Sequence, residues 1–399
     1  MPVNKMNELI LVPQPAEIDG DDHVRRCSVI RRDNGVNLSE KELWFRLPCS
    51  IALPDDSDCD SYLLAVFMDA LKEGRRIVVH GSVSGALLSN LVEYQSVWHK
   101  WLPDIYRVVD IQVDRVREGV CPAAGAISAF SGGVDATFTV WRHSQKKWSY
   151  RSQDIKLSAF VHGFDIPLTN GDAFASAFAR ARETLRDLNI ELFPIATNCK
   201  EISCVSWEHY FVSALVSVLI NFKRVAGVCL IGSGGDYNGF VIPLGSSPMT
   251  DYLLGSEEFI VMHDGASHNR TEKVKEISEW RKGVDNLRVC WEGELKDRNC
   301  GKCEKCLRTK LNFLASGGAV PDCLAGGDMA FSTIRLKNTS QYKELKSICH
   351  EARKNGVQGA WLAEVEKVLK DYAADHIPYS TKSLFMALAK RIKRKLLLV

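Results

Sequence analysis

The sequence Ser-Gly-Gly-Val-Asp-Ala-Thr at residues 131–137 joins a short apolar run, 126–130, to a stretch with apolar residues at helical spacing, 134–144. This order predicts a strand, a glycine turn and a helix. Two adjacent glycines permit a tight turn and let backbone N–H groups approach a ligand, and the start of the helix offers unpaired donors that suit a phosphate. Taken alone, the pattern fits an ordinary strand-to-helix turn equally well.

Outward from this turn, apolar strand candidates alternate with helical stretches. The predicted strands are 126–130, 157–162, 192–196, 226–231 and 258–262. The predicted helices between them are 134–144, 173–188 and 206–222. Such alternation predicts parallel strands joined by right-handed crossovers, with helices on both faces, and therefore a doubly wound α/β sheet.

Polar or glycine-rich residues follow each of the five predicted strands. They lie at 131–135, 162–165, 197–198, 232–237 and 263–265. Ligands of such sheets bind beyond the carboxyl ends of the strands, at the point where the strand order reverses. Packing alone does not explain five such strand ends, so the sequence favours a nucleotide site at this edge.

The flanking regions predict two additions to this central domain, which we place at 121–325. Residues 1–120 predict an α/β accessory domain with strands at 9–12, 27–31, 43–47, 77–79 and 106–113, helices at 61–72 and 87–98, and a linker at 115–122. Residues 326–399 predict a helical extension with one amphipathic helix around Trp361, Val365 and Leu369. The basic tail at 390–395 could touch RNA or acidic lipid, although a solvated helix end is the commoner explanation.

Composition limits the classes of function. The net charge of +2 gives no global electrostatic argument for a nucleic-acid or membrane partner. The chain has 13 cysteines, but its start lacks the pattern of a signal peptide and no apolar run approaches the ~20 residues of a membrane span. We therefore expect a cytoplasmic protein with reduced cysteines.

Four cysteines have the spacing of a metal site. Cys300, Cys303 and Cys306 follow one another at intervals of three residues, and Cys290 precedes them near the end of a candidate strand at 287–289. Four thiolates satisfy tetrahedral zinc, and Lys302, Lys305 and Arg308 would offset part of their charge. An iron–sulfur cluster is the alternative, but the C-x3-C-P element of bacterial ferredoxins is missing. Coincidental spacing is the third explanation, and structural zinc is favoured over both.

The turn and the cysteines together resemble one enzyme family. Ser-Gly-Gly-Val-Asp at 131–135 resembles the PP-loop of N-type ATP pyrophosphatases, which cleave ATP between the α and β phosphates. The cysteine pattern narrows this to something similar to 7-cyano-7-deazaguanine synthase, in which a PP-loop domain precedes a zinc site with a C-x2-C-x2-C core. Asp-Tyr-Asn-Gly at 236–239 resembles a family segment near the deazaguanine pocket. The likeness covers roughly residues 126–315 and implies an adenine nucleotide alpha-hydrolase-like fold.

The resemblance implies a reaction that uses ATP, Mg²⁺ and Zn²⁺. The family activates the carboxylate of 7-carboxy-7-deazaguanine with ATP, which releases pyrophosphate and forms an acyl-adenylate. An amine, ammonia in the known members, then displaces AMP to give an amide. A second ATP converts that amide to the nitrile.

The resemblance also implies roles for individual residues. The Ser131 hydroxyl would hold the departing pyrophosphate, together with the backbone N–H groups of Gly132, Gly133 and Val134. Asp135 would hold Mg²⁺ or fix the loop. Thr137 would add a further hydroxyl, and Arg270 and Lys273 would be phosphate-facing cations. Backbone groups around Phe160 and His162 would contact the adenine. Gly232 and Asp236 would lie at the edge of the nucleotide site. A salt-bridged surface helix explains Arg270 and Lys273 almost as well.

Two departures from the family pattern stand out. Family members usually have serine where this chain has Ala136, so one phosphate-binding hydroxyl is missing. The second departure is the accessory domain at 1–120 together with the helical extension. We hypothesise that the added domain binds a protein partner whose amine captures the acyl-adenylate, in the setting of an anti-phage defence system. A homodimer is also compatible with the resemblance.

Two alternatives to this function remain open. The first is a PP-loop enzyme that modifies tRNA or acts on another substrate. The second is a catalytically inactive module that binds a nucleotide, for which Ala136 is the best support. Release of pyrophosphate and AMP would separate an enzyme from such a module.

Overall fold

The computed structural model describes residues 7–290, 292–326 and 331–376 of the chain. One large mixed sheet runs through the molecule, in the order β11-β10-β7-β8-β9-β4-β3-β1-β5-β6, with β2 paired to β3. Its strands are β1 (Asn7–Pro13), β2 (Glu17–Asp19), β3 (Asp22–Asp33), β4 (Val36–Pro48), β5 (Arg76–Ser84), β6 (Ile111–Arg117), β7 (Ala126–Ala129), β8 (Ile155–His162), β9 (Glu191–Thr197), β10 (Val228–Gly232) and β11 (Ile260–Asp264). The α-helices are α1 (Asp60–Glu73), α2 (Gly85–Trp101), α3 (Val134–Ser144), α4 (Gly171–Arg186), α5 (Cys199–Ile202), α6 (Trp207–Leu219), α7 (Arg270–Ile277), α8 (Arg281–Asp285), α9 (Glu304–Ala315), α10 (Thr339–Lys354) and α11 (Ala360–His376).

The five strands predicted after residue 126 form one parallel block. Strands β9, β8, β7, β10 and β11 are hydrogen-bonded in that order, and every pair is parallel. The chain passes outward from β7 to β8 and β9, then returns across β7 to β10 and β11. The strand order therefore reverses between β7 and β10, which is where sheets of this kind open a crevice for a ligand.

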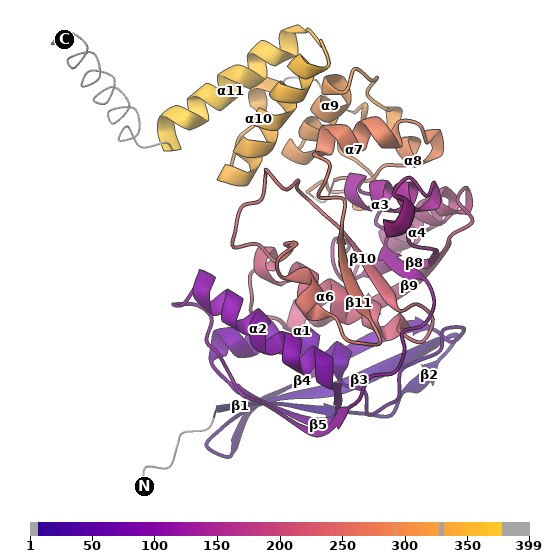
Figure 1. Cartoon of the computed structure of the whole chain (residues 1–399), viewed down its shortest axis with the longest axis vertical. Helices are drawn as coiled ribbons and strands as arrows, with labels where there is room; N and C mark the ends of the chain where they lie inside the picture. Colours follow the sequence, from indigo (N-terminus) through magenta and orange to yellow (C-terminus); the bar gives the residue numbers. More distant parts are fainter. Residues whose placement is uncertain (1–6, 291, 327–330, 377–399) are drawn as a thin grey trace, which may run out of the picture.

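Helices cover both faces of this block, as predicted. Side chains alternate along each strand, so Ile127 and Ala159 pack with α1, α2 and α6 on one face. Phe130 and Phe160 pack with α3 and α4 on the other face. The fold is thus α/β with a large, mostly parallel mixed sheet (Figure 1).

The N-terminal strands continue the same sheet. Strand β4 pairs antiparallel with β9, with Phe45 opposite Thr197 and Arg46 opposite Ala196. The apolar side chains of α1 and α2 share one hydrophobic core with those of α6. The predicted domain boundaries at 120 and 325 stay predictions, but both the sheet and the core cross residue 120.

Two sequence predictions in this region need correction. The structure extends β6 to Arg117, so the first three residues of the predicted linker at 115–122 belong to a strand. Residues 106–110 of the predicted strand at 106–113 lie outside β6. The cause is that β6 is an edge strand with a largely exposed, polar sequence, which the apolar pattern of a buried strand does not mark.

A buried ion network joins the N-terminal segment to the parallel block. The Lys223 ammonium lies 2.5 Å from Asp58 Oδ2 and 2.9 Å from Asp60 Oδ2. Arg117 reaches the same two carboxylates at 2.9 and 2.6 Å. Asp60 and Lys223 are 0% and 3% exposed, so these charges are stabilised by one another instead of by water.

The C-terminal helices form a separate layer above the sheet edge (Figure 1). Helices α9, α10 and α11 share a small core that contains Leu311, Ile348 and Val365. The amphipathic helix predicted around Trp361 is α11, whereas the basic tail at 390–395 lies outside the described residues. None of the described helices has the length and apolar character needed to cross a membrane.

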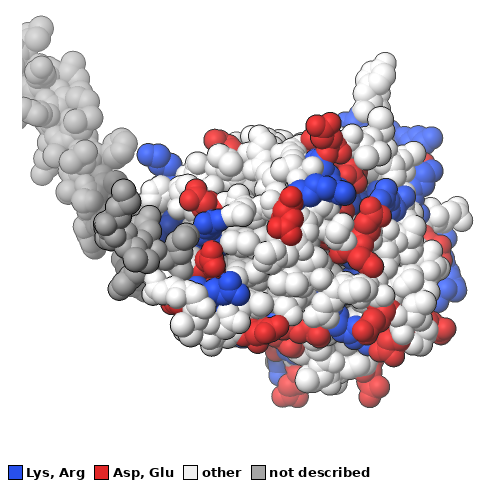
Figure 2. Space-filling view, turned by 90° about the horizontal axis from the view of Figure 1, so that it is seen from below, with Lys and Arg blue, Asp and Glu red and all other residues white. Residues whose placement is uncertain are grey.

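The lower face of the molecule, as Figure 1 is drawn, shows charges of both signs. In Figure 2, Lys and Arg side chains are interspersed with Asp and Glu and with uncharged residues. Nucleic-acid backbones attract a concentrated positive surface. This face does not have one.

Candidate functional site

The candidate site lies where the strand order reverses. A small cavity of about 190 Å³ is lined by residues of the 131–137 turn and by Gly232 at the end of β10. A larger cavity of about 810 Å³ shares four of its lining residues, namely Asp135, Gly232, Arg270 and Lys305. The two cavities therefore adjoin, and Asp135 stands between them.

The 131–137 turn has the backbone geometry that its glycines predict. Gly132 has a φ of +76°, in the left-handed region that favours glycine. The backbone N–H of Arg288 donates to the Gly132 carbonyl at 2.8 Å, and its guanidinium donates to the Ser131 carbonyl at 3.3 Å. Arg288 thus engages two carbonyl groups of the loop.

The N–H groups of the turn are left free. Among the described residues, no acceptor lies within hydrogen-bonding distance of the amides of Gly132, Gly133, Val134, Asp135 and Ala136. The residue that caps α3 is Gly133, which has no side chain to take these donors. Helices α2, α4, α7 and α10, in contrast, each have a Ser or Asn side chain that accepts one of their first amides. A run of free amides at a helix N-terminus, beside a cavity, is an arrangement that binds anions.

Two predicted cations meet at Asp135. Arg270 Nη2 lies 2.6 Å from Asp135 Oδ2, and Lys273 Nζ lies 3.1 Å from Asp135 Oδ1. Lys273 is 1% exposed and also donates to the Ser233 carbonyl. The structure thus brings Arg270 and Lys273 to the turn. Lys273 is buried in this cluster, and Arg270 and Asp135 are half-buried, so a solvated surface helix does not describe them.

Burial and charge set the ionisation of this cluster. Burial alone would raise the pKa of Asp135, but the positive charges of Arg270 and Lys273 outweigh it, so the pKa of Asp135 lies below its usual value. Burial lowers the pKa of Lys273, against the opposing effect of Asp135. Asp135 is therefore a carboxylate held between two cations.

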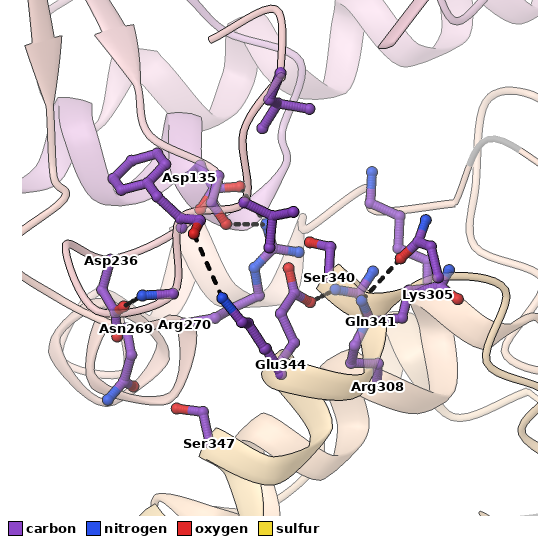
Figure 3. Close-up of a pocket in the computed structure, with 18 of the residues that line it drawn as sticks. Asp135, Asp236, Asn269, Arg270, Lys305, Arg308, Ser340, Gln341, Glu344 and Ser347 are labelled. Atoms are coloured by element: carbon purple, nitrogen blue, oxygen red, sulfur yellow. Dashed lines mark hydrogen bonds and ion pairs between the residues drawn. The ribbon is translucent and has the colours of Figure 1, made fainter. Parts of the chain in front are cut away.

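Helix α9 brings two further cations to the larger cavity. Lys305 lines both cavities, and Arg308 lines the larger one. Arg308 pairs with Glu304 at 2.8 Å and also with Glu344 of α10. Burial, followed by the charge of Arg270, lowers the pKa of Arg308 to about 10. Figure 3 shows these side chains around the pocket.

The walls of the larger cavity include the loop after β10 and four helices, α6, α7, α9 and α10. The loop after β10 contributes Asp236, whose Oδ1 accepts the Gly239 amide, and Phe240. Helix α6 contributes Phe211, α7 and α9 contribute the cations, and α10 closes the far side with residues such as Gln341. No residue of 7–120 lines either cavity, so the C-terminal extension supplies the added wall.

The four cysteines predicted to bind a metal converge on one point. Cys290 Sγ lies 3.5 Å from Cys300 Sγ and 3.7 Å from Cys303 Sγ, and Cys300 Sγ lies 3.9 Å from Cys306 Sγ. Sulfurs placed about 2.3 Å from a central zinc, at the corners of a tetrahedron, are about 3.8 Å apart. The cluster therefore has the dimensions of a tetrahedral metal site.

Hydrogen bonds hold the segments that carry these cysteines. The Asn299 side chain accepts the Cys290 amide at 3.2 Å and donates to the carbonyls of Leu287 and Cys323. The predicted strand at 287–289 is wrong: this segment is irregular, because its backbone bonds to the Asn299 side chain and to Gly132 in place of a neighbouring strand. Helix α9 begins immediately after Cys303, so the cluster and the cations of α9 belong to one rigid segment.

Other predicted residues lie farther from the cavities. Thr137 is 0% exposed and lines neither cavity, and its hydroxyl has no hydrogen-bond partner in the described part of the chain. The Phe160 ring is buried against Phe174, and the His162 ring stacks on the same Phe174. Burial lowers the pKa of His162. Ala136 of the turn, in contrast, lines the smaller cavity.

The sequence analysis missed three basic residues of this site, of which Lys305 and Arg308 line a cavity and Arg288 contacts the turn. Arg288 had no motif to mark it, because its contact with the turn depends on a loop that returns from 157 residues away. Lys305 and Arg308 were assigned only to the charge of the cysteine cluster. Their i, i+3 spacing on an amphipathic helix could have indicated that they share a face directed toward the turn.

We compared the chain with known proteins in three ways. No family model matches it. No curated protein and no solved structure matches it either.

Proposed function

We propose that this protein is an ATP-dependent ligase that adenylates a carboxylate and releases pyrophosphate. The carboxylate is 7-carboxy-7-deazaguanine, and an amine then captures the acyl-adenylate to give an amide or a nitrile. The proposal includes the PP-loop assignment of residues 131–137 and the doubly wound fold of the nucleotide-binding family that it resembles.

One observation carries the proposal. Five consecutive free amides, from Gly132 to Ala136, lie beside a cavity in which Arg270 and Lys305 supply positive charge. Pyrophosphate leaves ATP with its negative charge on the β and γ phosphates, and preorganised N–H donors stabilise such developing charge. The larger cavity has the volume of a small-molecule site and could hold the adenosine and the carboxylate substrate.

Within this proposal the residues have distinct tasks. The amides of Gly132 and Gly133 and the Ser131 hydroxyl hold the departing phosphates. Asp135 orients Arg270 and Lys273 toward them. Arg270 shields the charge at the mouth of the cavity, where its side chain is 14% exposed.

Zinc fits the cysteine cluster, and its task would be structural. The four Sγ atoms lie within 4.8 Å of one another, and thiolates are the ligands that zinc prefers. A four-cysteine site is closed to substrate, so the metal would supply folding energy. It would fix the start of α9 and with it Lys305 and Arg308.

Magnesium fits less directly. Asp135 is the carboxylate nearest the turn, and both of its oxygens are engaged by cations. Protein-bound Mg²⁺ commonly keeps substrate phosphates and water as most of its ligands. The arrangement favours a Mg²⁺ ion that arrives with ATP, and a loop-fixing task for Asp135.

The accepting amine is the part of the proposal with the least structural support. Residues 7–120 line neither cavity, so a protein amine that binds to them would have to reach the site from outside. Helix α10 faces the cavity directly and is better placed to select the acceptor. We retain a protein amine as a hypothesis alongside ammonia.

A second candidate function has its own support. Ala136 lacks the hydroxyl usual at this position, and Asp135 is engaged by two cations. Both features suit a module that binds a nucleotide without cleaving it.

One experiment separates the two candidates. The full-length protein is incubated with ATP, Mg²⁺ and 7-carboxy-7-deazaguanine, with ammonia or a candidate protein as acceptor, and products are identified by mass spectrometry. The ligase should yield AMP, pyrophosphate and an amide or nitrile, and Asp135→Ala should abolish them. ATP binding without AMP formation would support the binding module and contradict the ligase.

A further inference from the structure

Lys305 differs from the other cations around Asp135. Arg270 and Lys273 pair with Asp135, and Arg308 pairs with two glutamates. The Lys305 ammonium makes no ion pair or hydrogen bond with any of the described residues, and only its backbone carbonyl is engaged, by the Thr309 hydroxyl. The side chain of Lys305 is half-buried and lines both cavities. A desolvated cation without a partner is costly, unless a ligand provides the missing charge.

The place of Lys305 indicates what that ligand contacts. Lys305 and Ala136 both line the smaller cavity, beside the free amides of the turn. Ala136 offers only a methyl group there. An anion bound to the amides would therefore lack a side-chain donor from position 136 and would have the Lys305 ammonium on its other side.

The simpler explanation is that Lys305 offsets the charge of the cysteine cluster. Lys305 lines both cavities, whereas none of the four cysteines lines either one. No hydrogen bond joins Lys305 to a cysteine sulfur among the described residues. By its position, Lys305 is a cavity residue.

We propose that Lys305 is an anion-binding residue of the smaller cavity, where it contacts a phosphate oxygen of the bound nucleotide and replaces the donor missing at Ala136. The proposal rests on the proposed ATP site and goes beyond it, because it makes the cysteine cluster part of the phosphate site. Lys305 lies between Cys303 and Cys306, so the same segment would bind the metal and the phosphate. Thr271 Oγ1 donates to Asn312 Oδ1 at 2.8 Å and joins α9 to α7, which bears Arg270.

The test measures the affinity of the full-length, zinc-loaded protein for inorganic pyrophosphate with Mg²⁺, by calorimetry. Four variants are compared with the natural chain: Lys305→Met, Lys305→Arg, Ala136→Ser, and Lys305→Met combined with Ala136→Ser. Lys302→Met is the matched control, because Lys302 is an exposed lysine on the same cysteine-rich segment and lines neither cavity. Zinc content is measured on every variant.

We expect Lys305→Met to weaken pyrophosphate binding by about tenfold or more, the effect of losing one charge-assisted hydrogen bond. Lys305→Arg and Lys302→Met should stay within about threefold of the natural chain, since each keeps the cation at position 305. Adding Ala136→Ser to Lys305→Met should recover part of the loss. In the natural chain, Ala136→Ser should change the pyrophosphate affinity little, so that the effects of the two substitutions on affinity are not additive.

Three results would overturn the proposal. Unchanged affinity in Lys305→Met, with the natural chain binding pyrophosphate, would remove Lys305 from the site and leave the proposed function intact. Loss of zinc from Lys305→Met but not from Lys302→Met would assign Lys305 to the cysteine cluster. Failure of the natural chain to bind either ATP or pyrophosphate would remove the proposed function as well.

Discussion

At the scale of single residues, the turn at 131–137 depends on backbone conformation more than on side chains. Arg288 donates to the carbonyls of Ser131 and Gly132, and the amides of residues 132–136 have no acceptor among the described residues, so the loop presents donors to the cavity. This polarity requires the φ of +76° at Gly132. A residue with a Cβ can adopt that conformation only with strain.

We therefore predict that Gly132→Ala lowers the free energy of unfolding by about 1–2 kcal/mol. An added Cβ would have ordinary contacts, the nearest at 3.5 Å, so the cost comes from the backbone and not from a clash. Urea denaturation measures it. Gly234→Ala in the neighbouring loop is the control, because a Cβ there meets nothing within 4 Å and the backbone is not in the left-handed region. Equal stability of the two variants would contradict the assignment of strain to Gly132.

Asp135 predicts a specific response to acid. Burial raises its pKa, but Arg270 and Lys273 more than compensate, so the pKa in the folded protein lies below the ordinary value of 3.8. A carboxyl of this kind contributes stability that is complete above the unfolded-state pKa and is lost as the pH falls through the folded-state pKa.

We predict that the stability of the natural chain falls more steeply than that of Asp135→Asn as the pH is lowered from about 5 toward 3, a window set by the ordinary carboxyl pKa. The difference should not exceed about 1.4 kcal/mol per pH unit, because one proton is involved. Urea denaturation at a series of pH values provides the data. Asp285→Asn, in which the lost carboxylate faces the largely exposed Arg281, should follow the natural chain. Parallel curves for the natural chain and Asp135→Asn would show that Asp135 gains nothing from its two cations.

At the scale of elements, helix α9 connects the cysteine cluster with the cavity. Its first residue follows Cys303, its second is Lys305 and its first turn contains Cys306. Apolar contacts extend this unit to α3 and α7, because Phe138, Val274 and Cys306 lie in one hydrophobic cluster. A metal at the cysteines would hold all three helices in register.

We predict that Cys303→Ser removes bound zinc, from about one ion per chain to near zero, since a tetrahedral site needs all four ligands. Its free energy of unfolding should fall by at least about 2 kcal/mol, and amides at the start of α9 should exchange faster with solvent. Metal analysis and hydrogen exchange measure these effects. Cys121→Ser replaces an exposed cysteine outside the cluster and should change neither the zinc content nor the hydrogen exchange of α9. Full zinc content in Cys303→Ser would contradict the four-cysteine site.

The sequence predicted elements better than contacts between them. Periodicity placed all five strands of the parallel block, because a strand buried on both faces leaves a continuous apolar run. The spacing of the four cysteines along the chain identified the predicted metal site, because most of its ligands lie in one short segment. The predictions from sequence patterns were wrong where a segment's backbone conformation depends on partners elsewhere in the chain. The segment at 287–289 is held by Asn299 and Gly132, and the polar edge strand β6 is held by β5. The clamp that Arg288 makes on the turn was invisible for the same reason.

At the scale of the whole molecule, the N-terminal segment is built into the sheet. The pairing of β4 with β9, the shared core and the ion network around Lys223 all cross residue 120. Removal of one partner from a buried ion pair leaves an uncompensated charge. The segment therefore supports the parallel block even though it lines neither cavity.

This arrangement predicts one cooperative unfolding transition that includes both parts. Lys223→Met should lower the free energy of unfolding by about 3–5 kcal/mol, because it leaves Asp58 and Asp60 with fewer positive partners in a buried site. Arg224→Ala, which removes an exposed ion pair next to it, should cost less than about 1 kcal/mol. Unfolding is followed in urea by hydrogen exchange of β3 and of β8, which lie on opposite sides of the β4–β9 junction.

Both strands should lose protection at the same urea concentration in the natural chain and, at a lower concentration, in Lys223→Met. We expect no separate transitions, because unfolding one part alone would expose the paired edges of β4 and β9. It would also divide the core that α1 shares with α6. Two separate transitions would mean that residues 1–120 fold as an independent domain, as their sequence alone predicts. In that case the junction would be a docking surface between domains, and Lys223→Met would shift the two transitions apart instead of moving them together.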